Sequence, residues 1–191
     1  MNITVDKVTK AYQGTTVLKD ISFQISKGEA VRVTGRSGSG KSTLIRLLLG
    51  FERPDFGEIR FDAEQPGVLF QEDRFLEEQS GLDNIRITVP FAKEEDILRL
   101  AEAVDLSEND MRNAVADLSG GERIRIALLR AFLFAKDLLI LDEPFAGLDQ
   151  STKLHVKQFI LENRRGRALI VTDHDGLDFP EEGFREISVE G

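Results

Sequence analysis

Apolar and polar side chains alternate through the first thirty residues, and glycines at positions 14 and 28 interrupt the alternation. A period of two is typical of strands with one solvated face, so we expect antiparallel strands in this region. The run Glu29–Thr34 predicts a further strand, and Lys41–Leu49 predicts a largely apolar helix that Gly50 caps. Two short strand signals follow, at Gly57–Phe61 and Gly67–Gln71.

The pattern changes after residue 71, where polar and acidic residues become frequent. Four apolar residues between Ile97 and Val104 recur at the helical spacing i, i+3, i+4 and i+7. This periodicity predicts an amphipathic helix over Glu94–Asp105. We therefore expect residues 71–117 to form a helical lobe.

Two continuous apolar runs, Leu138–Leu141 and Ala168–Val171, each end in polar residues. Such runs are typical of buried parallel strands that carry functional residues at their carboxyl ends. A final strand is predicted over Phe184–Val189. The pattern as a whole predicts an α/β fold with a mostly parallel sheet, an N-terminal antiparallel β-subdomain and an inserted helical subdomain.

The composition narrows the function classes. A chain of 191 residues with 41% apolar content is long enough for one globular domain. The net charge of −9 argues against a protein that coats nucleic acid. No apolar run approaches the roughly 20 residues needed to span a bilayer, and no signal-peptide core is present. The absence of cysteine excludes disulfides and thiolate metal sites, as expected for a cytoplasmic protein.

A glycine-rich loop lies between the strand at Glu29–Thr34 and the helix after it, and it fits the P-loop pattern. In a P-loop, backbone N–H groups and the helix N-terminus hold phosphates, the lysine bridges the β- and γ-phosphates, and the hydroxyl ligates Mg²⁺. Without a ligand, the same loop is merely a turn before a core helix. The predicted phosphate-binding residues are Gly35, Arg36, Ser37, Gly38, Ser39, Gly40, Lys41, Ser42 and Thr43.

Carboxylates and two further polar residues lie at the ends of the other predicted strands. Asp142 is expected to hold Mg²⁺ opposite Ser42, and Glu143 to polarise the attacking water. Gln71 is expected to contact the metal or that water. His174 follows a buried strand from which it reaches a γ-phosphate, although an isolated histidine is more often structural.

The segment "DLSGGERIRIALLRA" (117–131) predicts a helix with a capping box formed by Ser119 and Glu122. A capped helix alone does not explain Gly120 and Gly121, which weaken the first turn by roughly 1 kcal/mol each relative to alanine. Paired glycines at a helix N-terminus suit the close approach of an anion. The chain thus carries two candidate anion sites.

These motifs together are similar to those of an ATP-binding cassette (ABC) ATPase, over essentially the whole chain. The resemblance rests on residues 35–43, Gln71, "LSGGE" (118–122), "LLILDEP" (138–144), "AGLD" (146–149) and His174. It implies a P-loop NTPase fold and one domain over 1–191, with 1–70 and 118–191 as nucleotide-binding core. It also implies that two subunits pack head to tail. The "LSGGE" segment (118–122) of each subunit, called the signature, then closes over the ATP on its partner's P-loop.

The resemblance assigns further roles. It implies that Tyr12 stacks on adenine, that Asp149 couples the two sites of a dimer, and that the face around Gln71–Ile85 meets a membrane-spanning partner. Three features depart from the family pattern: Arg32 lies in the strand before the P-loop, the stretch between Ile59 and Val68 is short, and few residues follow His174. Glu122 also stands where glutamine is commoner. The position of Arg32 requires either a buried carboxylate partner or an exposed edge. No accessory domain is expected after His174.

The resemblance implies an ATP-binding and ATP-hydrolysing subunit that energises a membrane transporter through ATP-dependent dimer closure. Its cofactor is Mg²⁺, its partners are a second cassette and a separate transmembrane permease, and no nucleic acid is expected. The protein would be cytoplasmic and peripheral to the cell membrane through the permease. The alternatives are a soluble ABC-type ATPase of DNA repair, translation or cofactor assembly, and a regulatory module that hardly hydrolyses ATP.

Overall fold

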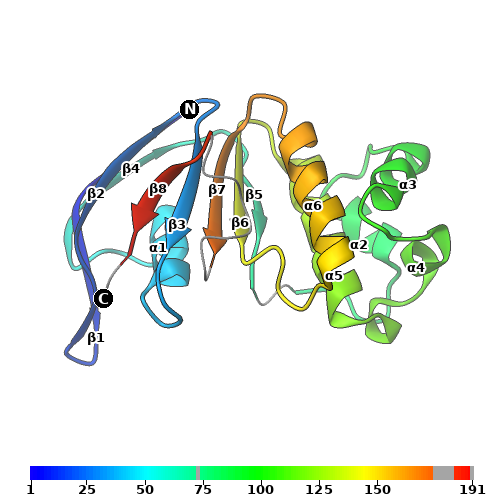
Figure 1. The fold of residues 1–191 in the computed structure, drawn as a ribbon, viewed down its shortest axis with the longest axis horizontal. Coiled ribbons are helices and arrows are strands. Elements are labelled where there is room, and N and C mark those ends of the chain that lie inside the picture. Colours follow the sequence, from blue (N-terminus) through cyan, green and yellow to red (C-terminus); the bar gives the residue numbers. More distant parts are fainter. Residues whose placement is uncertain (72–73, 174–182, 190–191) are drawn as a thin grey trace.

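The computed structural model describes residues 1–71, 74–173 and 183–189, which form two sheets (Figure 1). One is a three-stranded antiparallel sheet of order β2-β1-β4, and the other is a five-stranded sheet of order β5-β6-β7-β3-β8. The strands are β1 (Asn2–Tyr12), β2 (Thr15–Ser26), β3 (Ala30–Thr34), β4 (Phe56–Asp62), β5 (Gly67–Leu69), β6 (Leu138–Asp142), β7 (Ala168–Asp173) and β8 (Arg185–Ser188).

The helices lie on both faces of the five-stranded sheet (Figure 1). They are α1 (Lys41–Leu48), α2 (Gly81–Arg86), α3 (Glu94–Glu102), α4 (Glu108–Arg112), α5 (Gly120–Phe134) and α6 (Gln150–Asn163). A short 3₁₀ turn over Val115–Asp117 precedes α5. Helix α1 shares a core with the antiparallel sheet, whereas α5, α6 and the smaller helices cover the opposite face.

Strand β6 shows why its sequence is apolar at every position. Leu138 and Ile140 pack into the core that contains α1, and Leu139 and Leu141 pack into the core that contains α5 and α6. All four side chains are fully buried. Every described ladder of the five-stranded sheet is parallel, so the predicted parallel core is confirmed and the sheet is more uniform than the expected mixture.

The strand order brings the predicted chemistry to one edge of the sheet. β6, β7 and β3 are neighbours in the order β6-β7-β3, and parallel strands present their carboxyl ends at the same edge. The P-loop follows β3, and Glu143 follows β6. His174 follows β7 in the sequence but lies outside the described residues.

Two predicted helix ends are informative. Helix α1 ends at Leu48, one residue before the predicted end, and Gly50 follows with φ at 72° while Phe51 N–H donates to the Arg46 carbonyl over 2.9 Å. The helix expected to reach Asp105 stops at Glu102 instead, so that boundary was wrong. Asp105 adopts a left-handed φ of 58° that turns the chain away, a conformation that apolar periodicity does not signal.

Arg32 has the carboxylate partner that the sequence left open. Its side chain is only 7% exposed, and Nη2 donates over 2.9 Å to Glu186 on the neighbouring strand β8. Glu186 also accepts from the Thr34 hydroxyl over 2.7 Å. Hydrogen bonds from Thr34 and then Arg32 lower the pKa of Glu186. Arg32 therefore links β8 to β3, the strand that precedes the P-loop.

Within the described part of the chain, no helix is both long enough and apolar enough to cross a membrane. α2, α3, α4 and the 3₁₀ turn all fall inside residues 71–117. Their buried side chains belong to the same apolar core as those of α5 and α6. The division into a lobe over 71–117 and a core over 1–70 and 118–191 stays a prediction.

Candidate active site

The loop after β3 has the shape of a phosphate cradle. Gly35, Gly38 and Gly40 have φ of 155°, 79° and 103°. A Cβ on Gly40 would lie 2.8 Å from the side chains of Val17 and Leu18, and one on Gly35 would lie 2.3 Å from the Val189 carbonyl oxygen. Backbone conformation and close packing within the chain therefore require glycine at these positions.

The remaining loop residues complete the cradle. The Lys41 ammonium is buried and donates to the carbonyls of Gly35 and Arg36 over 2.7 and 3.2 Å. Ser39 N–H donates to the Arg36 carbonyl, whereas Ser39 Oγ is buried and has no hydrogen-bond partner among the described residues. Ser37 lies exposed in the turn, and Thr43 is buried in the first turn of α1. The unpaired hydroxyl and the folded-back lysine suit a loop that receives phosphate oxygens.

Asp142 and Glu143 share one hydroxyl, that of Thr172. Thr172 Oγ1 donates to Asp142 over 2.6 Å and accepts from Glu143 N–H over 2.9 Å. Glu143 adopts a φ of 53°, which is costly for a residue with a side chain and recurs at functional sites. Gln71 Nε2 donates to Glu143 Oε2 over 3.4 Å. The two candidate catalytic residues Gln71 and Glu143 are thus in contact across two strands.

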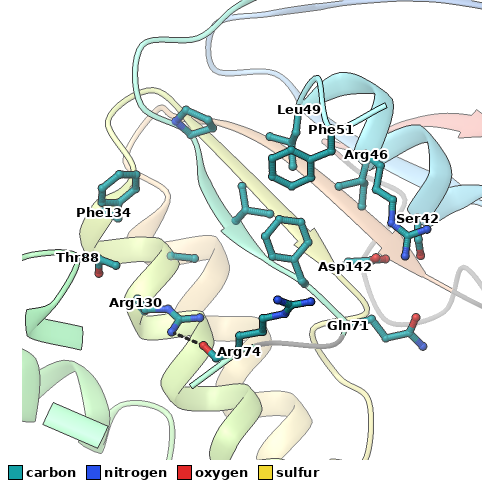
Figure 2. A pocket seen from close by; sticks show the side chains of 15 residues that line it. Ser42, Arg46, Leu49, Phe51, Gln71, Arg74, Thr88, Arg130, Phe134 and Asp142 are labelled. Atoms are coloured by element: carbon teal, nitrogen blue, oxygen red, sulfur yellow. Dashed lines mark hydrogen bonds between the residues drawn. The ribbon is translucent and has the colours of Figure 1, made fainter. Parts of the chain in front are cut away.

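Ser42, Gln71 and Asp142 line one hollow of about 920 Å³, which we name the P-loop groove (Figure 2). These are the three predicted metal ligands, and they come from α1, the end of β5 and β6. Their hydroxyl, amide and carboxylate oxygens are the donors that Mg²⁺ prefers. In residues 1–71, 74–173 and 183–189 no cluster of three His, Cys, Asp or Glu could hold a metal by itself. A Mg²⁺ ion here would need phosphate oxygens to complete its shell.

The rest of the P-loop groove is apolar with a rim of arginines. Its walls include aromatic rings of Phe51, Phe70 and Phe134, and the first two stack with centroids 5.9 Å apart. Figure 2 shows three arginines that line it: Arg46 from α1, Arg130 from α5, and Arg74 from the segment before α2. The groove therefore combines apolar area with positive charge on an acidic chain.

Tyr12 lies at the end of β1 and is 38% exposed. Its hydroxyl donates to Glu52, and the Lys10 ammonium lies 5.4 Å from the ring centroid. Partial burial and then the hydrogen bond to Glu52 raise the pKa of Tyr12. The ring is held at the surface, where a flat base can stack on it.

The signature helix α5 begins with the predicted capping box. Glu122 N–H donates to Ser119 Oγ over 3.3 Å, and Ser119 N–H donates to Glu122 over 2.7 Å. The two glycines differ. A Cβ on Gly121 would lie 3.1 Å from Leu148, whereas one on Gly120 would meet nothing within 4 Å. Neither a positive φ nor packing within the chain requires glycine at position 120.

Ser119, Gly120 and Gly121 line a second hollow of about 530 Å³, the signature hollow, together with Asp149. Asp149 caps α6, where it accepts from the Ser151 and Thr152 hydroxyls and backbone N–H groups. These bonds, that from the Ser151 hydroxyl first, hold its pKa well below the ordinary value. Among the described residues none lines both hollows, so the P-loop groove and the signature hollow are separate.

Sequence reasoning missed Thr172 and Glu52. A threonine at the end of an apolar run was the signal for Thr172, but its contact with Asp142 requires that β6 and β7 be neighbours. Glu52 follows α1 and meets Tyr12 only through the tertiary fold. The structure brings Ser42, Gln71 and Asp142 to one groove, and Glu143 contacts Gln71.

Comparison with known proteins supports the same interpretation. The ABC transporter family model matches residues 18–146. The aliphatic sulfonates import ATP-binding protein SsuB 1 of Shouchella clausii is 34% identical over 180 residues, which are 92% of this chain and 72% of that protein. SsuB of Cupriavidus necator is 36% identical over 90% of this chain and 60% of its own length. The taurine import ATP-binding protein TauB of Pseudomonas aeruginosa is 33% identical over 85% and 67%.

Solved structures share the fold. A dimeric ATP-binding cassette in a post-hydrolysis state, bound to ADP and Pi, has a TM-score of 0.86 and 25% identity and covers 98% of this chain and 94% of its own. A putative ABC transporter ATP-binding protein from Pyrococcus furiosus has a TM-score of 0.85 at 21% identity, with 99% and 98% covered. With the P-loop, the signature and the matching family model, the chain belongs to the ABC transporter family and is its ATP-binding cassette.

Proposed function

We propose that the chain is the ATP-hydrolysing subunit of an ABC importer, cytoplasmic and attached to the membrane through a separate permease. One observation carries the proposal: the predicted metal ligands Ser42, Gln71 and Asp142 line the P-loop groove together with apolar and arginine side chains. A partner seated in the groove would contact the same hollow as the γ-phosphate. Hydrolysis and partner movement are then coupled through shared residues.

The residues divide the chemistry among them. Lys41 and the loop N–H groups bind the β- and γ-phosphates, and Ser42, Asp142 and Gln71 would hold Mg²⁺. When bound, Mg²⁺ supplies positive charge to the phosphate oxygens. Glu143 accepts a proton from the attacking water while Gln71 orients the carboxylate, and His174 is assigned to the γ-phosphate by its place after β7.

The signature hollow supports a second, trans-acting half of the site. Gly120 has open space where a Cβ would lie, although alanine is the better helix former. A close approach by a molecule outside the chain explains this choice. We assign that role to ATP on the P-loop of a second cassette, packed head to tail, with Ser119, Gly120 and Gly121 at its γ-phosphate.

The P-loop groove suits an amphipathic permease helix with an acidic side chain. Phe51 is 67% exposed there, and Arg46 and Arg74 provide charge for a carboxylate. The relatives named above import aliphatic sulfonates or taurine. A sulfonate is therefore the cargo class to test first. A soluble role in DNA repair, translation or cofactor assembly is not favoured, because these relatives are import proteins.

The test of the composite site mixes two inactive chains, Lys41→Ala and Ser119→Arg. Each homodimer has two damaged sites. A heterodimer has one doubly damaged site and one intact site, with Lys41 from the signature variant and Ser119 from the P-loop variant. We expect ATPase activity, or ATP-trapped dimers when Glu143→Gln is added to both chains, to reappear on mixing.

The control shows subunit exchange by mixing differently tagged wild-type chains. Absence of rescue in mixtures that exchange subunits would refute the composite site and leave "LSGGE" as a helix cap.

A further inference from the structure

The segment Arg74–Ser80, here the connecting segment, links the P-loop groove to the signature helix. Gln71, which contacts Glu143, lies three residues before Arg74 in the sequence. At its other end, the carbonyls of Glu77 and Gln79 accept from Ala116 and Val115 over 3.0 Å each. The connecting segment therefore runs beside the turn that immediately precedes Ser119.

An ion pair joins the connecting segment to α5 directly. Arg123 Nη1 and Nη2 donate to the two carboxylate oxygens of Glu77 over 2.7 and 2.5 Å, a bidentate geometry. Arg123 lies one turn inside α5, adjacent to Glu122 of the capping box. The hydrogen bonds from Arg123 lower the pKa of Glu77, so the carboxylate is charged throughout the neutral range.

A second contact reinforces the ion pair. The guanidinium groups of Arg123 and Arg130 lie 5.4 and 4.9 Å from the ring centroid of Phe75. These arginines are seven residues apart and hence on the same face of α5. Arg130 also donates to the Arg74 carbonyl over 3.1 Å, a bond drawn in Figure 2. One face of the signature helix is thus fastened along the connecting segment from Arg74 to Glu77.

We propose that Glu77 is a positioning residue that, through Arg123, holds the signature helix in the orientation required for the ATP-dependent dimer. The inference rests on the proposed head-to-tail function. The Glu77 side chain is 47% exposed and that of Arg123 is 29% exposed, and ion pairs as exposed as this one add little to the stability of a fold. The ion pair instead fixes the direction in which the N-terminus of α5 points. A small change in that direction displaces Ser119 and Gly120 from the partner's phosphate.

The test uses Glu143→Gln chains, ATP and Mg²⁺, and measures dimer formation by analytical ultracentrifugation. We expect Glu77→Gln to weaken ATP-driven dimerisation about tenfold, a typical size for coupling between sites. ATP affinity of the monomer and the unfolding midpoint should stay unchanged, because the P-loop and the core do not involve this pair. The matched control is Glu108→Gln, which breaks an exposed ion pair with Arg112 inside the same lobe.

The double variant Glu77→Arg with Arg123→Glu reverses the pair and should restore dimerisation to within about threefold. Dimerisation of Glu77→Gln equal to that of Glu108→Gln would overturn the inference, and so would a parallel loss of ATP affinity, which indicates a general structural defect. If the Glu143→Gln chain itself fails to dimerise with ATP, the proposed head-to-tail function fails first.

Discussion

The two predicted anion-binding regions differ in whether contacts within the chain account for their glycines. In the P-loop, positive φ and close contacts with Val17, Leu18 and Val189 require glycine within the chain. At the start of α5, Gly121 is matched to Leu148, but Gly120 faces open space. Contacts and backbone conformation within the chain account for the glycines of the first region, whereas no contact within 4 Å accounts for Gly120. Gly120 therefore supports the proposed approach of a group from outside the chain.

The largest effect is expected from Glu143→Gln, which tests the P-loop side of the comparison. Loss of a catalytic base costs about 10²–10⁴-fold in turnover, while ATP affinity should hold because Lys41 and the loop bind the phosphates. Hydrolysis is measured by phosphate release and affinity by equilibrium binding. Near-normal turnover would show that a residue other than Glu143 is the catalytic base.

Matched glycine substitutions sharpen the comparison itself. Gly40→Ala forces a left-handed φ and a close contact onto alanine, and we expect a loss of about 1–3 kcal/mol in unfolding free energy. Gly120→Ala should instead raise it by about 0.4–1 kcal/mol, yet weaken ATP-trapped dimers. Urea unfolding and ultracentrifugation measure the two effects. Normal dimerisation of Gly120→Ala would refute the explanation that a group from outside the chain approaches Gly120.

The proposed contact between the permease and the P-loop groove is tested by Phe51→Ser. The side chain is 67% exposed and apolar, so its removal should lower retention of the copurifying permease about tenfold. Binding to the wild type should survive moderate salt, because apolar contact is not screened. The control is Phe56→Ser on β4, whose ring is 72% exposed and outside the groove. Equal losses in both variants would exclude the groove.

The smallest expected effect is the pH dependence of the unfolding free energy that Asp149, in the signature hollow, produces. The folded-state pKa of Asp149 is lowered below its unfolded value, so its stabilising contribution is complete above the ordinary aspartate pKa. That contribution is lost progressively as pH falls below about 4. Urea unfolding should show wild type and Asp149→Ala differing most at pH 7, with a difference that starts to shrink below about pH 4 and is smaller at pH 3. Asp149→Asn still caps α6 but does not titrate, so it should remain flatter with pH than wild type.

The sequence by itself determined the fold class, the P-loop, the capping box and the strand-end carboxylates. These features depend on local spacing: period-two and period-3.6 apolar patterns, glycines before a helix, and polar residues directly after buried strands. The same locality allowed the end of α1 before Gly50 to be predicted to within one residue. It could not locate the end of α3, since the left-handed turn at Asp105 leaves no apolar signal.

Only the tertiary structure decided the contacts that join distant segments. Arg32 meets Glu186, Thr172 links Asp142 to Glu143, Glu52 holds Tyr12, and Arg123 pairs with Glu77. Each pair depends on strand order or on how one element lies against another, and many partners would satisfy the same charge. The distinction between Gly120 and Gly121 is of this kind too, because it depends on whether Leu148 or open space lies beside the missing Cβ.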